Sequence, residues 1–181
     1  MPYENNTGLP SVTQVINPWL PTQFFTDEAR DRGTYVHDWA EAYLNGAWFP
    51  LNHPEWQGYV DSLKAWIDHN VVETVLVEKR LIHPGLNYCG KMDLFATVVF
   101  KSGLAQLDWK TSQAPADWWE LQSWAYAELG HVNGYKVKWG ASVRAHSDGS
   151  IATFTPYDPK RWPKMKNIFI SHLNCWNFHN K

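Results

Sequence analysis

Gly90-Lys91-Met92-Asp93-Leu94 and Leu107-Asp108-Trp109-Lys110-Thr111-Ser112 are the two segments that decide the fold. Each has the character of a β-strand, in which side chains two positions apart lie on one face. If the two strands pair as a hairpin, Asp93 of the first reaches the face of the second that carries Asp108 and Lys110. The sequence therefore predicts two carboxylates and one ammonium group within a small volume.

Two carboxylates brought together repel each other and resist ionisation unless a cation lies between them. Carboxylate oxygens are hard ligands that suit Mg²⁺ or Mn²⁺, and a neighbouring lysine can orient a water molecule or neutralise charge that develops on a phosphate. An isolated Asp-x-Lys pattern is more typical of separate edge-strand aspartates and a solvated lysine. Further candidate residues along the chain favour the metal site instead.

The composition is typical of a globular protein. Of the 181 residues, 44% are hydrophobic and 19% are charged, which predicts a single domain over residues 1–181. The net charge of −2 excludes a generally basic nucleic-acid coat, so any DNA contact must be local. The two cysteines are too few for a disulfide framework or a four-cysteine metal cluster. Because neither a secretory signal nor a bilayer-spanning apolar stretch is visible, we expect a cytoplasmic protein without a membrane partner.

The chain reads as a succession of helices and strands. The first long helix begins at Thr26, with two acidic residues in its first turn, and ends at Asn45-Gly46. A strand rich in β-branched residues covers residues 71–82, and a turn at residues 101–103 joins the two strands quoted above. An irregular arm is predicted over residues 1–10 and a short ordered piece over 11–16. Further helices are predicted over 54–70, over 117–129, where Gly130 ends the helix, and from about 158 onward. A hairpin of strands 135–145 and 151–157 is predicted to turn at 147–150.

Gly33, His37 and Glu41 are spaced four residues apart and form one row on the first predicted helix. The glycine, one turn before His37, leaves room for a group to approach the imidazole ring. Taken alone, this histidine is more typical of a boundary position with a partly exposed glutamate neighbour. On a later strand, Glu78 is either a further acid near the metal or an exposed side chain.

Polar and basic side chains in the C-terminal half add to the candidates. Gln122 and Tyr126 are one helical turn apart, where they can hydrogen-bond a phosphate or the lysine. A surface glutamine and a half-buried tyrosine fit these residue types equally well. The last helix opens with Lys160, Arg161, Lys164 and Lys166, and Arg144 precedes it on the hairpin. A solvated basic face is the ordinary interpretation of such a cluster, and in a nuclease it would contact phosphate.

Four motifs together resemble a known family. They are Gly33-Thr34-Tyr35-Val36-His37, Gly90-Lys91-Met92-Asp93-Leu94, Leu107-Asp108-Trp109-Lys110-Thr111-Ser112 and Gln122-Ser123-Trp124-Ala125-Tyr126. Their order and their elements resemble the PD-(D/E)XK nuclease superfamily, and within it the RecB-type exonuclease branch. That branch has a helix-borne histidine, a G-x-x-D strand, a D-x-K-T strand and a Q-x-x-x-Y helix. Residues 11–13 are also similar to it, so the resemblance covers residues 11–126. Each motif alone is weak, and four in the right order are specific.

The resemblance implies an α/β fold with a restriction-endonuclease-like core, in which helices flank a mixed central sheet and the metal site lies at one sheet edge. The implied ligands of one or two Mg²⁺ or Mn²⁺ ions are His37, Asp93, Asp108 and the main-chain carbonyl of Trp109. Lys110 would position or activate the attacking water. Gln122 and Tyr126 would hold the site or the DNA backbone. Only its position supports Glu78 as a possible further metal ligand.

The implied function is metal-dependent hydrolysis of DNA by an exonuclease that leaves 5′-phosphate and 3′-hydroxyl ends, in recombination, repair or replication. The expected DNA contacts are Thr111, Ser112, Arg144, Lys160, Arg161 and Lys164. The expected partners are single- or double-stranded DNA with a free end and a recombination or replication protein. Related nucleases often carry a four-cysteine iron–sulfur cluster, which two cysteines cannot hold, so none is expected. The chain is similar to small stand-alone phage exonucleases, and a phage origin would place it in the bacterial cytoplasm.

Two alternatives remain open at the level of the sequence. The first is a structure-specific or nicking endonuclease, because no arch or ring that would enforce a free DNA end is visible. The second is a nuclease-like domain that binds DNA or a partner without cutting. Asp93, Asp108 and Lys110 argue against the second alternative, because binding alone does not require all three.

Overall fold

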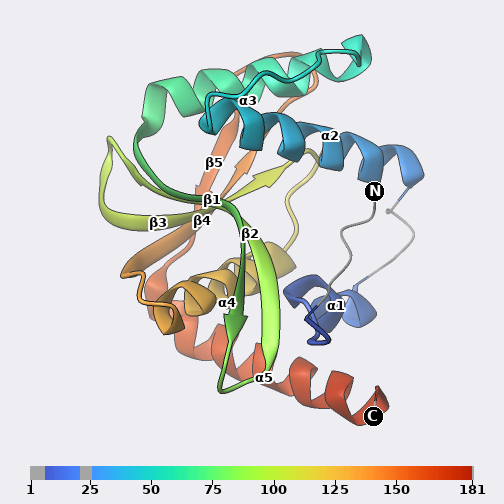
Figure 1. The fold of residues 1–181 in the computed structure, drawn as a ribbon, viewed down its shortest axis with the longest axis vertical. Coiled ribbons are helices and arrows are strands. Elements are labelled where there is room, and N and C mark those ends of the chain that lie inside the picture. The colour runs from blue at the N-terminus through green and yellow to red at the C-terminus, as the bar shows by residue number, and fades with distance from the viewer. Residues whose placement is uncertain (1–6, 21–25, 181) are drawn as a thin grey trace.

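Figure 1 shows the computed structural model of the protein, which describes residues 7–20 and 26–180. A five-stranded sheet forms its centre, and its strands follow one another in sequential order. They are β1 (Val71–His83), β2 (Tyr88–Val98), β3 (Lys101–Lys110), β4 (Val137–Arg144) and β5 (Thr153–Pro156). β3 and β4 are parallel, and the other neighbouring strands are antiparallel. Because parallel neighbours need a crossover, a helix connects β3 to β4.

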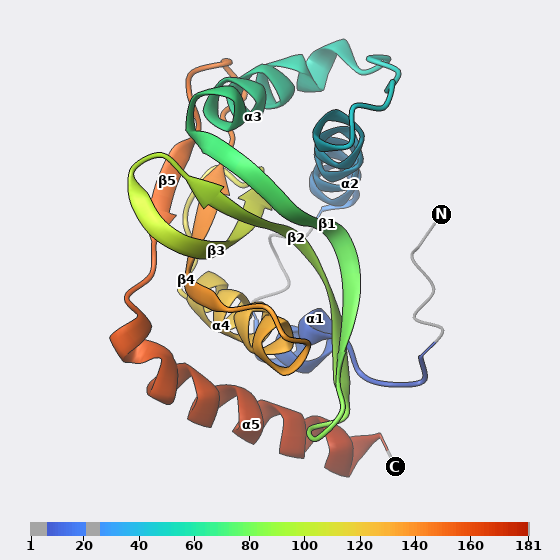
Figure 2. The same ribbon diagram turned by 60° about the vertical axis from the view of Figure 1, so that its left-hand side comes forward.

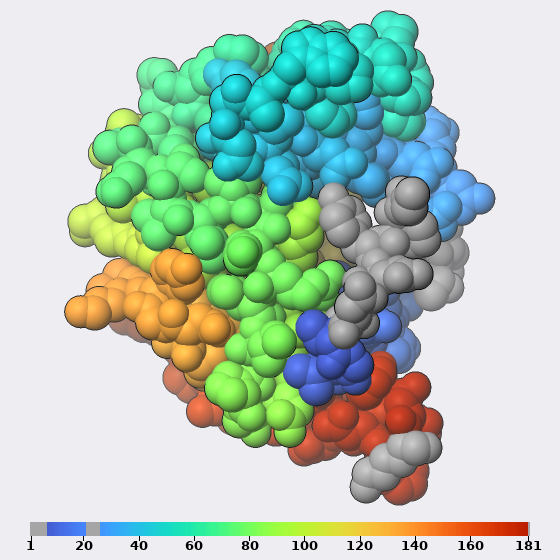
Figure 3. Space-filling model, in the orientation of Figure 1, coloured from blue at the N-terminus to red at the C-terminus, as the bar shows by residue number. Residues whose placement is uncertain are grey.

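Helices cover both faces of this sheet (Figures 1 and 2). One layer consists of α2 (Asp27–Leu44) and α3 (Gln57–Asn70), the latter preceded by the short η3 (Pro54–Trp56). The other layer consists of α1 (Val12–Ile16), η1 (Asn17–Trp19), α4 (Trp118–Val132), η4 (Pro159–Arg161) and α5 (Trp162–His179). The predicted fold class, a mixed sheet flanked by helices, is confirmed. In Figure 3 the strands β1 and β2 (green) form the middle of one molecular face, between α2–α3 and α5.

Each face of the sheet has its own apolar core, because alternate strand residues point to opposite sides. Leu94 and Leu107 belong to the cluster beneath α2 and α3, which includes Trp39 and Trp66. Phe95 belongs to the cluster beneath α1, α4 and α5. The polar side chains of β3 face the second layer, as the hydrogen bond from Ser123 of α4 to Gln106 shows. Asp108, two residues further on, therefore also points toward α4.

The predicted ends of the first long helix are confirmed. Thr26 is the N-cap, and its hydroxyl oxygen accepts a hydrogen bond from the main-chain N–H of Ala29 at 3.1 Å. Asn45 is the C-cap, and Gly46 follows with a φ of 65°, in the left-handed region that suits glycine. The predicted strand over 71–82 corresponds to β1 and extends one residue further.

Three predicted turns or ends differ from the structure. The β2–β3 turn lies at residues 99–100, because Val98 already pairs with Lys101, and residues 101–103 belong to β3. Gly130 lies inside α4, where a Cβ atom would come within 2.8 Å of Phe95, so close packing is the reason for this glycine. The predicted second hairpin is present as β4 and β5, with shorter strands and a longer connection over residues 145–152.

Residues 7–10 of the predicted irregular arm form no helix or strand, and residues 1–6 lie outside the described residues. The carbonyl of Pro10 accepts a hydrogen bond from the main-chain N–H of Cys89 at 2.9 Å, which ties the arm to β2. Within residues 7–20 and 26–180, no helix combines the length and the apolar character that crossing a bilayer requires.

Candidate active site

A cleft of about 640 Å³ opens beside β1, one of the two edge strands, and residues of both helical layers line it. Residues from α2, the first three strands, α4 and the segment around α1 line it. Seven of the predicted site residues line this cleft: His37, Glu78, Asp93, Asp108, Lys110, Gln122 and Tyr126. Residues far apart in the sequence thus contribute to one cavity, as His37 and Tyr126 do.

The pairing of β2 with β3 fixes Asp93. Leu94 lies opposite Leu107 in the antiparallel ladder, and the next position is Asp93. Here the main-chain N–H of Trp109 donates a hydrogen bond of 2.7 Å to Oδ2 of Asp93. The carboxylate is buried, so this charge-assisted bond holds it in one orientation and leaves Oδ1 directed toward α2.

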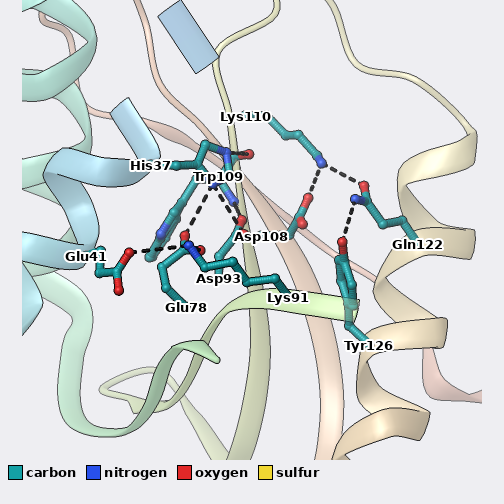
Figure 4. A network of polar contacts seen from close by, with 10 residues as sticks. All are labelled: His37, Glu41, Glu78, Lys91, Asp93, Asp108, Trp109, Lys110, Gln122 and Tyr126. Atoms are coloured by element: carbon teal, nitrogen blue, oxygen red, sulfur yellow. Dashed lines mark hydrogen bonds and ion pairs between the residues drawn. The ribbon is translucent and has the colours of Figure 1, made fainter. Parts of the chain in front are cut away.

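The imidazole of His37 lies between two buried carboxylates (Figure 4). Its Nδ1 is 3.3 Å from Oδ1 of Asp93 and 3.4 Å from Oε1 of Glu78. Its Nε2 is 3.2 Å from the carbonyl oxygen of Trp109, and because a carbonyl only accepts, Nε2 carries a proton. Burial lowers the pKa of His37, but the two carboxylates outweigh burial and hold the pKa well above its usual value.

Glu78 is held in a strained backbone conformation. Its φ is 45°, in the left-handed region, although it lies inside β1. The neighbouring pairs Val77–Leu94 and Lys79–Met92 place it opposite Asp93 on the adjacent strand. Like charges at opposite positions of a sheet repel, and such strain typically occurs at functional sites. Glu78 is buried and lines the cleft, so the alternative of an exposed side chain is wrong.

His37, Glu78 and Asp93 together offer a set of donors that fits a divalent cation. One ligand atom from each residue lies within 4.8 Å of the other two. Two carboxylate oxygens and an imidazole nitrogen are ligands that Mg²⁺ and, more readily, Mn²⁺ accept. A proton on Nδ1 supplies only one positive charge between the two negative carboxylates. A divalent ion at the same place would supply two positive charges and neutralise both carboxylates.

Lys110 is fixed on the other side of the cleft (Figure 4). Its ammonium group forms an ion pair with Asp108 and donates a hydrogen bond of 2.8 Å to Oε1 of Gln122. The amide of Gln122 in turn donates to the hydroxyl oxygen of Tyr126 at 3.2 Å. Burial raises the pKa of Asp108, and the ammonium of Lys110 opposes that effect. The residues of the predicted Gln-x-x-x-Tyr motif thus hold the lysine of the Asp-x-Lys motif.

The predicted ligand set is therefore divided into two groups. His37 and Asp93 lie together with Glu78, and the Trp109 carbonyl contacts the ring of His37. The carboxylate of Asp108 instead pairs with Lys110. Lys110 also lies 5.3 Å from the ring centre of Trp118, a distance that allows a cation–π contact.

The residues predicted to contact DNA lie mostly away from the cleft. The hydroxyl of Ser112 donates to the carbonyl of Ala114 at 3.0 Å, and Arg144 donates to the carbonyl of Gln113 at 2.9 Å. Thr111 is buried, with its hydroxyl near Gly33 of α2. Arg161 and Lys164 line a second cavity between α4 and α5, Arg161 pairs with Glu120 at 2.9 Å, and Lys160 is exposed.

Several polar residues of the cleft were missed by the sequence analysis. They are Ser11, Thr13, Gln14, Arg30, Thr34, Asp38, Arg80 and Lys91. Two of them had a signal in the sequence. Arg30 is two helical turns before His37, and Arg80 is two residues after Glu78 on one strand, so each shares a face with a site residue.

No family model and no curated protein matches the sequence. Among solved structures, the fold is similar to that of a candidate exonuclease from Eubacterium rectale, with a TM-score of 0.57 and 9% sequence identity over 94% of this chain and 74% of that chain. The crystal structure of LHK-Exo in complex with dAMP matches 95% of this chain and 89% of that chain, with a TM-score of 0.39 and 12% identity. The first likeness shows a shared fold.

Proposed function

We propose that this protein is a metal-dependent DNA nuclease of the RecB-type branch of the PD-(D/E)XK superfamily, and that it acts as an exonuclease. The observation that carries the proposal is the arrangement of Lys110 between Asp108 and Gln122, in the same cleft as His37 and Asp93. The similarity of the fold to that of a candidate exonuclease supports the same assignment. The proposed products have 5′-phosphate and 3′-hydroxyl ends, and the proposed setting is DNA recombination, repair or replication.

Mg²⁺ or Mn²⁺ would be held by His37, Glu78 and Asp93 and, when bound, would lower the pKa of a coordinated water and stabilise charge on the scissile phosphate. His37 is oriented for this role by the Trp109 carbonyl. Because that carbonyl accepts a hydrogen bond from the Nε2–H group, the neutral ring would present the lone pair of Nδ1 toward Glu78 and Asp93.

Lys110 would orient the attacking water and stabilise negative charge on the phosphate. Asp108 keeps the ammonium group in the cleft, and the amide oxygen of Gln122 fixes its direction. Burial raises the pKa of Tyr126, so its hydroxyl stays protonated and its oxygen holds the Gln122 amide. Removing a preorganised group of this kind typically lowers kcat by about 10²–10³-fold.

Cleavage of end-labelled DNA tests the proposal. Linear and covalently closed circular substrates, single- and double-stranded, are incubated with Mg²⁺, Mn²⁺ or EDTA. We expect metal-dependent loss of linear DNA by the wild type and a loss of at least about 10²-fold in Lys110→Ala, with an unchanged fold by circular dichroism. Lys79→Ala is the matched control, because Lys79 is an exposed lysine of β1 that does not line the cleft.

Each other outcome has a defined meaning. Cutting of closed circles would reassign the protein as an endonuclease. Full activity in Lys110→Ala would refute the proposed role of the lysine. A folded, metal-binding wild type that binds DNA and cuts none of the substrates would favour a non-catalytic binding domain.

A further inference from the structure

The buried carboxylates of the cleft differ in whether a lysine is paired with them. Among the described residues that line it, the buried carboxylates are those of Glu78, Asp93 and Asp108. Lys110 is paired with Asp108, and Lys91 is paired with Glu78, whose Oε2 is 2.9 Å from the Lys91 Nζ. Two of the three buried acids are thus each paired with an ammonium group of this chain.

The two carboxylate oxygens of Glu78 have different partners. Oε1 faces Nδ1 of His37 and belongs to the group of donors described above, whereas Oε2 faces Lys91. A carboxylate with one oxygen held by an ammonium group offers only the other to an ion. Lys91 therefore makes Glu78 a ligand with one oxygen.

Glu41 anchors Lys91 from the solvent side. Its Oε2 is 3.3 Å from Nζ of Lys91, and its side chain is 39% exposed, compared with 3% for Glu78. Glu41 lies one turn after His37 on α2, so the helix that supplies a ligand also supplies the anchor. Figure 4 shows Lys91 between Glu41 and Glu78, on the side of the site away from Lys110.

The charge balance then limits how many divalent ions the site can hold. The three buried carboxylates, the two lysines paired with them and Glu41, which shares Lys91, carry two net negative charges, so one divalent ion neutralises this group and a second would leave it doubly positive. A second divalent ion would compete with Lys91 for Oε2 of Glu78 or with Lys110 for Oδ2 of Asp108. Excess like charge in a buried site is strongly unfavourable.

We propose that Lys91, anchored by Glu41, takes the place of a second ion, so that this centre binds one divalent cation. The inference rests on the metal site of the proposed function and concerns how that site is loaded. Lys91 is in this view a positioning residue that holds Glu78 and sets the stoichiometry of the centre.

Counting bound ions without DNA tests this inference. Isothermal titration calorimetry and the electron paramagnetic resonance of free Mn²⁺ give the number of ions per chain. We expect one Mn²⁺ in the wild type and in Lys91→Arg, which keeps the charge. We expect two in Lys91→Met, with the first bound at least about tenfold more tightly because a repelling charge is gone. Lys91→Gln, which keeps an N–H donor for both glutamates, is the second variant and is also expected to bind two.

Lys79→Gln is the matched control and is expected to bind one ion. Two ions in the wild type, no ion in the wild type, or one ion in both uncharged variants would each overturn the inference. The result is separable from the test of nuclease activity. A wild type that binds one Mn²⁺ but cuts no DNA would refute the nuclease and leave the role of Lys91 standing.

Discussion

Gly90 begins the motif that carries Asp93, and packing against α4 explains why this position is glycine. A Cβ atom at position 90 would lie 2.6 Å from Cε1 of Tyr126 and 3.0 Å from Cδ1 of Leu129. Both side chains are buried, so neither can move into solvent. Overpacking of this kind costs about 1–3 kcal/mol. With roughly 2–4 °C of Tm per kcal/mol for a chain of this size, a cost of about 2 kcal/mol lowers the Tm of Gly90→Ala by about 4–8 °C.

The same substitution should also reduce activity, because the ring that must move carries the hydroxyl that holds Gln122. Urea unfolding followed by tryptophan fluorescence gives the loss in the free energy of unfolding, and the DNA cleavage assay gives the loss in rate. Gly85→Ala is the matched control: its Cβ would lie 3.6 Å from His83, an ordinary contact, so a change within about 0.5 kcal/mol is expected. Equal stability of Gly90→Ala and Gly85→Ala would refute the packing argument.

Three further predictions concern other parts of the molecule. His37→Ala should weaken Mn²⁺ binding at least about tenfold in calorimetry because it removes a proposed ligand nitrogen, and unchanged affinity would remove His37 from the proposed ligand set. Phe169→Ala should lower the free energy of unfolding in urea by about 3–5 kcal/mol, since the ring is fully buried between α5 and α4; a loss under 1 kcal/mol would contradict that. Thr26→Ala should cost about 1 kcal/mol in thermal unfolding by removing the N-cap bond to Ala29, whereas Thr26→Asn should retain most of it.

Local patterns were sufficient to predict the elements and the central pair of strands. The capping residue Thr26 and the glycine after Asn45 defined the ends of α2, because both act through main-chain geometry within a few residues. Alternation along β2 and β3 was sufficient to place Asp93 near Asp108 and Lys110, since pairing of neighbouring strands fixes which side chains share a face.

Features that depend on contacts distant in the sequence were not predictable in this way. The end of α4 was placed at Gly130, because a glycine after an apolar stripe typically ends a helix. Its true role is to admit the ring of Phe95 from β2. Similarly, a cluster of Lys160, Arg161 and Lys164 is basic in the sequence, but the folded chain places Arg161 beside Glu120 and outside the cleft. Charge in the sequence does not specify which acid lies opposite.

The sequence alone could not decide between a site residue and an exposed side chain for Glu78, because its role depends on a strained backbone conformation. A left-handed φ at a residue other than glycine costs about 1–3 kcal/mol, and the carboxylate of Asp93 on the opposite strand adds repulsion. A cation that binds only the folded chain offsets such costs by mass action, by about 2.7 kcal/mol at a concentration one hundred times its Kd. Because the strain and the repulsion fall on the same residue that faces His37 and Lys91, binding of the proposed ion would be coupled to the stability of this sheet edge through Glu78.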